Sequence, residues 1–451
     1  MNERSSVSTR GSRRAPGPGA LRAINYGIGF VRDPFAVLNN STHRYGTIVR
    51  FGIGDRCVHL IHQPEHVQHV LLDNNRNYEK SSPFGLLKLL FGRGLLFNEG
   101  SSWFSQRRLL QPSFQPKQVA ARADGITHVI GSTVDAWPRA DADNINIEDD
   151  MTHLARRIIG ELLFGMELPN ELDVILESED SKFAFLLGNV PLTPQNITYK
   201  AAMRRVDKTV YGIIAERRAS DNESVDMLSM LMSAVDKDSG ECMDDTQLRD
   251  EIVTLLFSGF DTTSRTLTWV FHALAQNPEV EAALHQELET VLQGRAPHVN
   301  DLPNLPYTQM LVKETMRMFP ANAIIGRRAK ADDVIDGHAI PAGSYLTISP
   351  YLAQHSAKIW DKPEHFDPLR FAPEREKTIG KFDYYPFGAG PRQCIGKGLA
   401  MMTIPLAVAM IAQRYRFTSL PGFVVEHDIK VTFQSRRGIR AKRHLRPAYD
   451  A

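Results

Sequence analysis

Cysteine is scarce in this chain, which has only Cys57, Cys242 and Cys394 among its 451 residues. Three cysteines cannot build a disulfide framework, because any pairing leaves one thiol over. A reducing compartment is the simplest setting for such a composition. We therefore expect a soluble cytoplasmic protein whose fold depends on its core rather than on disulfides.

The sequence also lacks a long apolar run. The longest, Leu399–Ala412, is interrupted by Thr403 and Pro405 and is shorter than the roughly 20 residues that cross a bilayer. We expect no membrane span. The first residues are polar, basic and rich in Ser, Gly and Pro, without the apolar core of a secretory signal. They predict a flexible leader over residues 1–22, with an organellar transit peptide as the alternative.

The chain also lacks an excess of charge of either sign. Lys plus Arg is 53 and Asp plus Glu is 52, which gives a formal net charge of +1. No global basic field therefore indicates nucleic acid or an anionic membrane surface as a partner. The chain is 42% hydrophobic and 23% charged, which is typical of a globular protein. No repeat or low-complexity linker divides it after residue 20, so we predict a single domain over residues 23–451.

Apolar residues recur with a helical period along most of the chain, which predicts a mainly α fold with small peripheral β-sheets. The predicted helices cover residues 118–137, 146–164, 199–218, 224–235, 246–276, 278–293 and 306–318. Two β-like runs within residues 47–62 predict a hairpin, and Pro64 then begins a helix. Short runs within residues 329–352 predict a small sheet. Residues 188–196, with two prolines, predict a mobile loop.

An irregular stretch rich in Pro and Gly ends in the segment Phe387–Ala400, FGAGPRQCIGKGLA. Its glycines allow tight bends around Cys394, and an apolar helix that follows at once would aim its N-terminal amides at the sulfur. Such a setting stabilises a thiolate, which can be a metal ligand, a nucleophile or a redox centre. A buried inert cysteine is the alternative that the residues leave open.

At this loop the sequence resembles the cytochrome P450 family. All fixed positions of the pattern Phe-x-x-Gly-x-Arg-x-Cys-x-Gly are matched, by Phe387, Gly390, Arg392, Cys394 and Gly396. The resemblance covers residues 30–445 and implies the cytochrome P450 fold, haem b as cofactor and Cys394 as the ligand of its iron. It also makes Gly388 part of the haem-binding loop.

A second match concerns Glu314 and Arg317, whose spacing by itself predicts only an ion pair on a helix surface. The segment Phe366–Phe371 resembles the meander of the family, whose arginine, Arg370, would join the two in a buried network. A buried charged triad costs desolvation, so the resemblance implies that it holds the geometry of the cysteine loop. Leu369 stands where the family commonly has an acidic residue.

Trp103 and Arg107 are four residues apart and should share one helix face. The residues alone permit ordinary packing, whereas the resemblance makes both of them donors to a haem propionate. By the same resemblance, Arg392 and Arg327 contact the haem carboxylates, with Arg328 as the alternative to Arg327.

The long predicted helix contains the segment Ser258–Thr263, SGFDTT. Its Thr262 side chain could simply bond back to a carbonyl one turn earlier. The resemblance instead places this segment over the distal haem face, with room for dioxygen at Gly259. Asp261 and Thr262 are then the catalytic residues that deliver protons. Ser258 stands where the family usually has Ala or Gly.

The resemblance implies a haem-thiolate monooxygenase of secondary metabolism that hydroxylates or epoxidises a medium-sized hydrophobic substrate with one atom of O2. That substrate would be a terpenoid, fatty acid, steroid or polyketide. The candidate pocket residues are Phe84, Leu87, Phe257, Ser258, Asn322, Ile324 and Ile325.

No Gly-rich dinucleotide motif occurs in the sequence, so electrons from NAD(P)H are expected to arrive through a separate partner. A ferredoxin or flavodoxin with its reductase would fill this role. Arg108, Lys397 and Arg375 are candidates for a basic docking patch. The protein itself is expected to be a monomer.

Several alternatives remain open. A haem-thiolate enzyme acting without O2, as a peroxygenase, isomerase or dehydratase, would not need the Asp261–Thr262 pair. A non-enzymatic haem protein is another alternative, and a zinc site is a third, at Cys57, His59, His62, His66 and His69. The basic run Arg436–Arg446 predicts an exposed strand edge guarded by charges rather than a nucleic-acid site.

Overall fold

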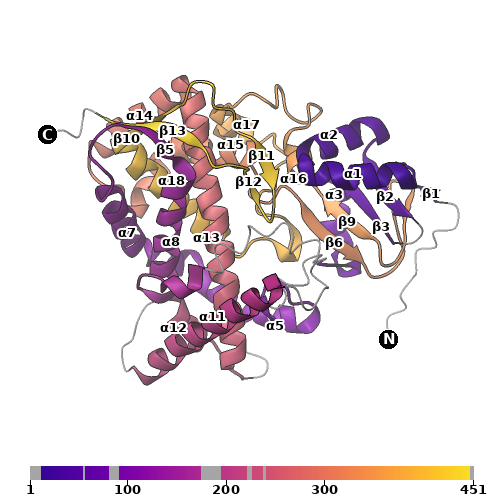
Figure 1. Ribbon diagram of the computed structural model, residues 1–451, viewed down its shortest axis with the longest axis horizontal. Coiled ribbons are helices and arrows are strands. Elements are labelled where there is room, and N and C mark those ends of the chain that lie inside the picture. Colours follow the sequence, from indigo (N-terminus) through magenta and orange to yellow (C-terminus); the bar gives the residue numbers. More distant parts are fainter. Residues whose placement is uncertain are drawn as a thin grey trace. The chain divides into compact units, whose positions relative to one another are not determined.

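The computed structural model describes residues 12–53, 56–80, 91–173, 194–220, 226–236 and 240–446. Helices dominate this part of the chain, and the strands are short (Figure 1). The predicted fold class is therefore confirmed. The chain divides into two compact units, so a single domain over residues 23–451 stays a prediction. Unit 1 comprises Met1–Ser82, Lys313–Cys394 and Val425–Arg437, and unit 2 comprises Pro83–Val312, Ile395–Val424 and Gly438–Ala451.

The largest sheet belongs to unit 1 and has the strand order β2-β3-β9-β6-β4. Its strands are β2 (Ile48–Ile53), β3 (Arg56–Ile61), β4 (Tyr78–Lys80), β6 (Ile325–Ala329) and β9 (Tyr345–Ile348). β2 and β3 form the predicted antiparallel hairpin, and β3 also pairs in parallel with β9. Because side chains alternate along a strand, Ile48, Ile61 and Ile348 are all buried in one hydrophobic cluster.

Two smaller sheets complete the strands of unit 1. They are formed by β1 (Arg13–Arg14), β8 (His338–Ile340) and β7 (Asp333–Ile335), and by β11 (His427–Ile429) and β12 (Phe433–Ser435). The helices of unit 1 are α1 (Ala20–Arg32), α2 (Pro34–Tyr45), α3 (Pro64–Gln68), α16 (Pro350–Gln354) and α17 (Pro373–Glu376). The prediction of a flexible leader up to residue 22 is wrong for residues 13–14 and 20–22, because these pair with β8 or begin α1.

Unit 2 is built mainly of helices. They are α5 (Gly100–Leu110), α6 (Pro116–Ala120), α7 (Ala123–Asp135), α8 (Ile147–Phe164), α11 (Pro194–Ala219), α12 (Met227–Met232), α13 (Asp245–Gln276), α14 (Pro278–Leu292) and α18 (Lys397–Arg414). α15 (Pro306–Met318) begins in unit 2 and ends in unit 1. The single helix predicted over residues 118–137 is divided between α6 and α7.

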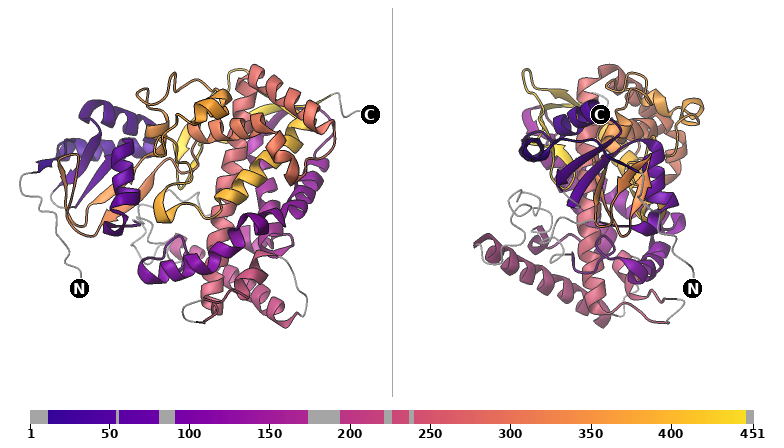
Figure 2. Two further views of the ribbon diagram at one scale, coloured as in Figure 1. Left: turned by 180° about the vertical axis from the view of Figure 1, so that it is seen from behind. Right: turned by 90° about the vertical axis from the view of Figure 1, so that its right-hand side faces the viewer.

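α13 is the longest helix, and α8 packs along it (Figures 1 and 2). Most α13 side chains from Leu248 to Leu274 are buried, including Phe257, Phe260 and Trp269. This helix therefore supplies much of the core of unit 2. No helix among the described residues is both long enough and apolar enough to span a membrane.

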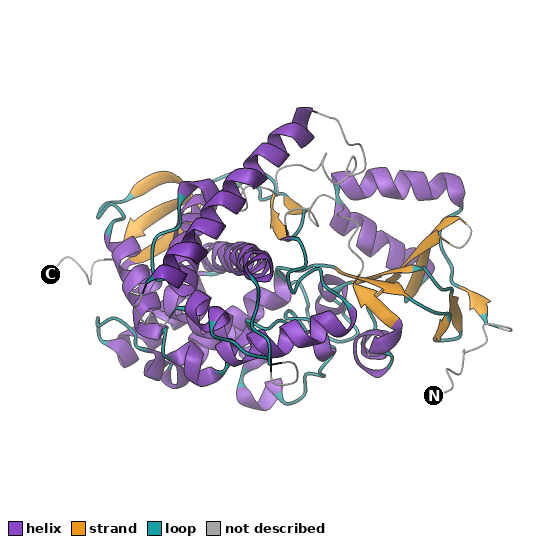
Figure 3. Ribbon diagram, turned by 90° about the horizontal axis from the view of Figure 1, so that it is seen from below, coloured by secondary structure: helices purple, strands orange, loops and turns teal. Residues whose placement is uncertain are grey.

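The sheet of unit 2 corrects one prediction. Its order is β10 (Tyr415–Ser419), β13 (Arg440–Leu445) and β5 (Ala142–Asn146), so the basic strand β13 lies in the centre and not at an edge. Figure 3 shows these strands in orange near the C-terminus. Arg443 of β13 is buried, and its guanidinium lies 3.2 Å from an Asp150 carboxylate oxygen and above the Trp137 ring. The predicted exposed edge is wrong because β5, distant in sequence, pairs with β13.

Candidate active site

The cysteine loop lies in unit 1, and glycines determine its path. Gly388 and Gly390 have φ angles of +67° and +70°, in the left-handed region that side chains disfavour. A Cβ built on Gly390 would lie 1.9 Å from the carbonyl oxygen of Leu71, so no side chain fits there. The amide of Cys394 donates to the carbonyl of Phe387 at 2.9 Å, which closes the loop.

Cys394 is exposed at the end of this loop. The alternative of a buried inert cysteine is therefore wrong. Helix α18 begins at Lys397, three residues further on, as the sequence predicts. Arg392, in the short 3₁₀ turn before the cysteine, is half-buried. The loop thus presents a thiol close to a helix N-terminus.

Glu314, Arg317 and Arg370 meet in unit 1, as the sequence predicts. The Arg317 guanidinium donates to both Glu314 carboxylate oxygens, at 2.7 and 2.9 Å. Arg370 Nε donates to one of them at 3.3 Å. Burial raises the pKa of Glu314, and the bonds from the two arginines oppose that rise. Leu369 is half-exposed, so the missing acidic residue leaves no buried gap.

The two arginines also bind the main chain of the meander. Arg317 donates to the carbonyls of Gln354 and Pro363, at 2.7 and 2.8 Å. Arg370 donates to the carbonyls of Asp361 and Lys362, at 2.5 and 2.8 Å. The guanidiniums thus supply hydrogen-bond donors to main-chain carbonyls of an irregular segment. The triad therefore fixes the backbone of this segment.

Gln354 connects the triad with the cysteine loop, although sequence reasoning missed it. Its fully buried amide nitrogen donates to the carbonyls of Met316 and Arg317, at 3.0 and 2.9 Å. Its amide oxygen accepts the main-chain N–H of Tyr385 at 3.2 Å. The carbonyl of Tyr385 in turn accepts the N–H of Gly388 at 2.9 Å. A continuous series of hydrogen bonds therefore runs from α15 to the loop.

Strand β6 distinguishes the two candidate arginines, because neighbouring residues of a strand point to opposite faces. Arg327 is buried and donates to the carbonyl of Gly326. Arg328 is exposed and lies 3.3 Å from Glu79. Arg327 is therefore the better candidate for a buried carboxylate contact.

Three candidate pocket residues lie between α15 and β6 or at the start of β6. Asn322 is exposed, and Ile324 and Ile325 are half-buried. Two others, Phe84 and Leu87, lie outside the described residues, as do residues 188–193 of the predicted mobile loop.

In unit 2, Trp103 and Arg107 lie one turn apart on α5. The Trp103 ring is 2% exposed, whereas Arg107 is half-buried. Both side chains therefore face inward to different depths on one side of the helix, as their spacing predicts.

The middle of α13 carries a strip of accessible residues. Ser258, Gly259, Thr262 and Thr263 are half-buried, while their neighbours are mostly buried. The hydroxyl of Thr262 donates to the carbonyl of Ser258 at 2.7 Å, which is the local bond that the sequence offers as an alternative. Each such hydroxyl keeps its oxygen lone pairs available on the strip.

Gly259 has a packing reason of its own. A Cβ built on it would lie 2.6 Å from Cδ1 of Ile159 on α8. The glycine therefore permits the close approach of α8 to α13. Room for dioxygen at this position stays a prediction.

Asp261 is 2% exposed beside this strip. Its Oδ1 accepts from Nε of Arg265 at 3.1 Å, and Arg265 also pairs with Glu148 at the start of α8. Its Oδ2 is buried and has no hydrogen-bond partner among the described residues. A carboxylate with one oxygen hydrogen-bonded and the other without a partner is suited to accepting and releasing a proton.

The zinc alternative is wrong. Cys57 and His59 do lie together, with a nitrogen of the ring 3.9 Å from the sulfur, but the other three histidines do not join them in a metal-binding group. His66 and His69 approach aspartates instead. The described residues contain no group of three or more His, Cys, Asp or Glu side chains that could hold a metal.

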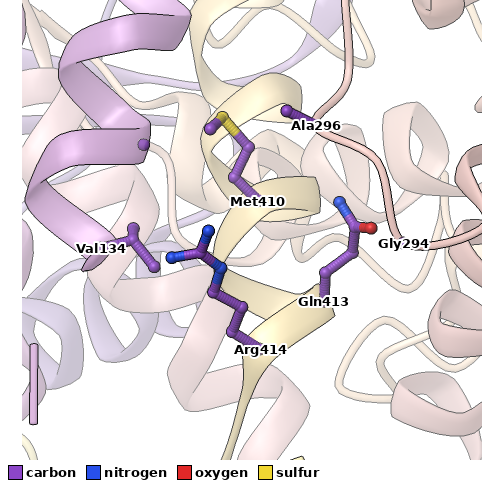
Figure 4. Close-up of a pocket in the computed structure, with 7 residues that line it drawn as sticks. Val134, Gly294, Ala296, Met410, Gln413 and Arg414 are labelled. Atoms are coloured by element: carbon purple, nitrogen blue, oxygen red, sulfur yellow. The ribbon is translucent and has the colours of Figure 1, made fainter. Parts of the chain in front are cut away.

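Two further features carry no active-site chemistry. A small pocket in unit 2 is lined by Val134, Met410, Gln413 and Arg414, among others (Figure 4). Its Arg414 pairs with Asp135, so the pocket offers no reactive group. The predicted docking arginines are also paired, Arg108 with Asp236 and Arg375 with Asp367.

The comparisons with known proteins decide the family. The family model described as "Cytochrome P450" matches residues 16–433. The chain belongs to the cytochrome P450 family. Membership makes haem iron the cofactor and O2 the co-substrate of this P450, and it makes the protein a monooxygenase that requires a redox partner.

Three Streptomyces proteins are similar to this P450 over almost its whole length. Cyclooctatin synthase of Streptomyces melanosporofaciens is 33% identical to this P450, with 92% of each chain covered. Cyclooctat-9-en-7-ol 5-monooxygenase of the same organism is 31% identical, with 94% of this chain and 95% of that one covered. Pentalenene oxygenase of Streptomyces avermitilis is 30% identical, with 94% and 96% covered.

Solved structures share the fold. The heme domain of cytochrome P450DA superimposes with a TM-score of 0.87 at 21% identity, covering 97% of this P450 and 99% of that chain. Retinoic acid-bound cyanobacterial CYP120A1 gives a TM-score of 0.86 at 21% identity, covering 96% and 100%. Both likenesses concern the fold alone.

Proposed function

We propose that this P450 inserts one atom of O2 into a cyclic terpenoid, by hydroxylation or epoxidation. The observation that carries the reaction class is the exposed thiol of Cys394 on its glycine-shaped loop. The substrate class is supported by three relatives at 30–33% identity. Two of their names describe the oxygenation of cyclooctat-9-en-7-ol and of pentalenene, and the third describes the synthesis of cyclooctatin. Fatty acids, steroids and polyketides are the alternatives.

The residues present fit haem. Cys394 would hold the iron as a thiolate, and Phe387, Gly388, Gly390 and Gly396 would shape the loop around it. Trp103, Arg107, Arg327 and Arg392 would bind the propionates through N–H donors and positive charge. When bound, haem with a thiolate ligand supplies the activation of dioxygen.

Asp261 and Thr262 are proposed to move protons. The buried Oδ2 of Asp261, which has no hydrogen-bond partner among the described residues, would take up and release them, while Arg265 holds the other oxygen in place. The Thr262 hydroxyl, accessible on the α13 strip, would hydrogen-bond the reacting oxygen group through the lone pairs that its bond to the Ser258 carbonyl leaves available. A peroxygenase would not need this pair, so its presence favours a monooxygenase that uses O2 and external electrons.

The proposed substrate wall is apolar. Phe257 of α13 lies 5.0 Å from Phe91, which is itself 5.0 Å from Phe97, measured between ring centroids. Ser258, Ile324, Ile325, Phe84 and Leu87 stay candidates for the lining from the sequence. Asn322 would orient a hydroxyl or carbonyl group. Such a lining suits a compact hydrocarbon skeleton with few polar groups.

The electrons are proposed to come from NAD(P)H through a ferredoxin or flavodoxin with its reductase. The protein would act in the cytoplasm as a monomer. Arg108, Arg375 and Lys397 are the proposed docking contacts, and the two arginines also pair with aspartates.

The test has two stages. First, the ferric protein is titrated with pentalenene, a cyclic terpene alcohol, a fatty acid and a steroid, and the shift of the Soret band towards the high-spin position is recorded. Second, the tightest ligand is incubated with ferredoxin, reductase, NADPH and O2, and in parallel with peroxide alone. The proposal expects a terpenoid to bind tightest and to gain one oxygen atom only with the redox system. Preferential binding and oxidation of a fatty acid or steroid would overturn it.

A further inference from the structure

Helix α1 in unit 1 has apolar side chains on two opposite sides. On the inner side, the Tyr26 ring packs against Tyr45 and Phe51, with centroids 6.3 and 5.6 Å away. On the outer side, Ile24, Ile28 and Val31 are 62%, 51% and 50% exposed. α1 is therefore an amphipathic helix whose aliphatic side faces away from the part of unit 1 that Tyr26 contacts.

The three exposed residues form one stripe, because positions i, i+4 and i+7 share a helix face. Single exposed aliphatic residues are ordinary on protein surfaces, and Val424 is an example at 79% exposure. Three exposed aliphatic residues along one helix face form a continuous apolar patch, and such a patch indicates a contact site.

The charge around α1 is of one sign. The helix carries exposed Arg22 and Arg32 and no acidic residue, and exposed Arg13 and Arg14 precede it in β1. Over residues 1–32 there are six arginines and one glutamate, whereas the rest of the chain has 47 basic and 51 acidic residues. The first 32 residues, which include α1, therefore carry an excess of basic charge that the rest of the chain does not have.

The first acidic residue after the helix, Asp33, is a single charge, so residues 13–33 keep a net positive charge. Asp33 accepts the main-chain N–H of Ala36 at 2.9 Å and so caps the N-terminus of α2. Its carboxylate is thus engaged at a helix end, where the helix dipole favours a negative charge. The surface of α1 that is available to a partner is therefore an apolar stripe flanked by arginines.

We propose that α1 docks this protein on the surface of an anionic lipid bilayer. Ile24, Ile28 and Val31 enter the interface between headgroups and acyl chains, while Arg22 and Arg32 contact the lipid phosphates. A second copy of the chain fits less well, because a symmetric interface would bring the same arginines together. The inference rests on α1 alone and is independent of the proposed substrate.

The test uses the full-length, haem-loaded protein in a vesicle sedimentation assay. One set of vesicles is phosphatidylcholine, and the other also contains phosphatidylglycerol. We expect binding to the anionic vesicles to be at least about tenfold tighter, since each arginine near such a surface contributes about 1 kcal/mol. Added salt should weaken this binding, because it screens exposed charges.

Two double variants separate the contributions. Ile24→Gln with Ile28→Gln should weaken binding at least about tenfold, because two aliphatic side chains no longer leave water. Arg22→Gln with Arg32→Gln should also weaken binding to anionic vesicles about tenfold and should leave the weak binding to phosphatidylcholine unchanged. Val424→Gln is the matched control and should bind as the unchanged protein does. Melting temperature and the spectrum of the reduced carbon monoxide complex show that each variant is folded.

Three results would overturn the proposal. One is sedimentation with neither kind of vesicle, and another is equal binding by the folded isoleucine variant. The third is a dimer, seen by size-exclusion chromatography with light scattering, that the isoleucine variant abolishes, because a second copy would then be what covers α1.

Discussion

The side chain of Gln354 accepts the main-chain N–H of Tyr385 at 3.2 Å, and this bond ties α16 to the segment that leads into the cysteine loop. The nitrogen of the same amide binds the end of α15, where Arg317 belongs to the buried triad. Gln354 is therefore a positioning residue, since it acts on Cys394 through the backbone between them.

Replacing Gln354 tests this relationship. Gln354→Leu leaves two carbonyls and one N–H buried without partners, so we expect the free energy of unfolding to fall by about 2–4 kcal/mol. We also expect the Soret band of the reduced carbon monoxide complex to convert to a shorter wavelength on mild warming. Exposed Gln286→Ala is the control. Unchanged stability and spectrum in Gln354→Leu would show that the loop does not depend on this side chain.

The buried triad should be far more sensitive than a surface pair of the same spacing. Glu314→Gln leaves Arg317 and Arg370 without a counter-charge in the core, which should cost about 3–5 kcal/mol of stability or prevent folding. Lys377 and Glu374 form an exposed pair with the same i,i+3 spacing, so Glu374→Gln should leave the denaturation midpoint unchanged. Equal effects of both substitutions would contradict the structural role of Glu314.

Glu251 should make stability depend on pH. Its side chain is fully buried, one oxygen accepts the N–H of Leu95 at 3.0 Å, and burial raises its pKa to about 8. Between the unfolded value of 4.5 and that value, the folded state holds the proton more tightly, so stability falls as pH rises through this window.

The comparison of Glu251→Gln with the unchanged protein checks this dependence. The variant has no charge to bury, so its advantage in urea denaturation should grow from pH 5 to about pH 8. Exposed Glu279→Gln should show a constant difference over the same range. A constant difference for Glu251→Gln as well would mean that this carboxyl titrates in its ordinary range.

Asp261 is expected to matter for turnover rather than for folding. Asp261→Asn removes the proton carrier, so product formation with the redox system should fall roughly 100-fold, with a larger solvent isotope effect. Turnover driven by hydrogen peroxide, which brings its own protons, should fall much less. Thr268→Val, on the same helix, is the control. Equal losses in both assays would assign Asp261 a structural role instead.

The parts of the fold that followed from the sequence are those with one buried face. α8, α13 and α14 each show a helical period because one side packs inward, and the β2–β3 hairpin shows alternation. α1 is amphipathic, but it was missed because its first residues were assigned to the polar leader, which is rich in Ser, Gly and Pro. The central place of β13 could not be read from its basic residues, since it depends on pairing with β5, distant in sequence.

The candidate site also contains both residues that the sequence predicts and residues that it does not. Glu314, Arg317 and Arg370 come from recognisable motifs, and the structure brings them together. Gln354 gave no signal, because its partners are main-chain groups that any residue supplies. The packing role of Gly259 was equally hidden, since it depends on Ile159 of another helix.

The absorbance spectrum of the reduced protein with carbon monoxide tests the central claim, thiolate ligation by Cys394, most directly. The account predicts a strongly red-shifted Soret band in the unchanged protein and its loss in Cys394→Ala, while Cys242→Ala, the other exposed cysteine, keeps it. A band at the position of a neutral or nitrogenous ligand in fresh protein, or a red-shifted band that survives Cys394→Ala, would contradict it.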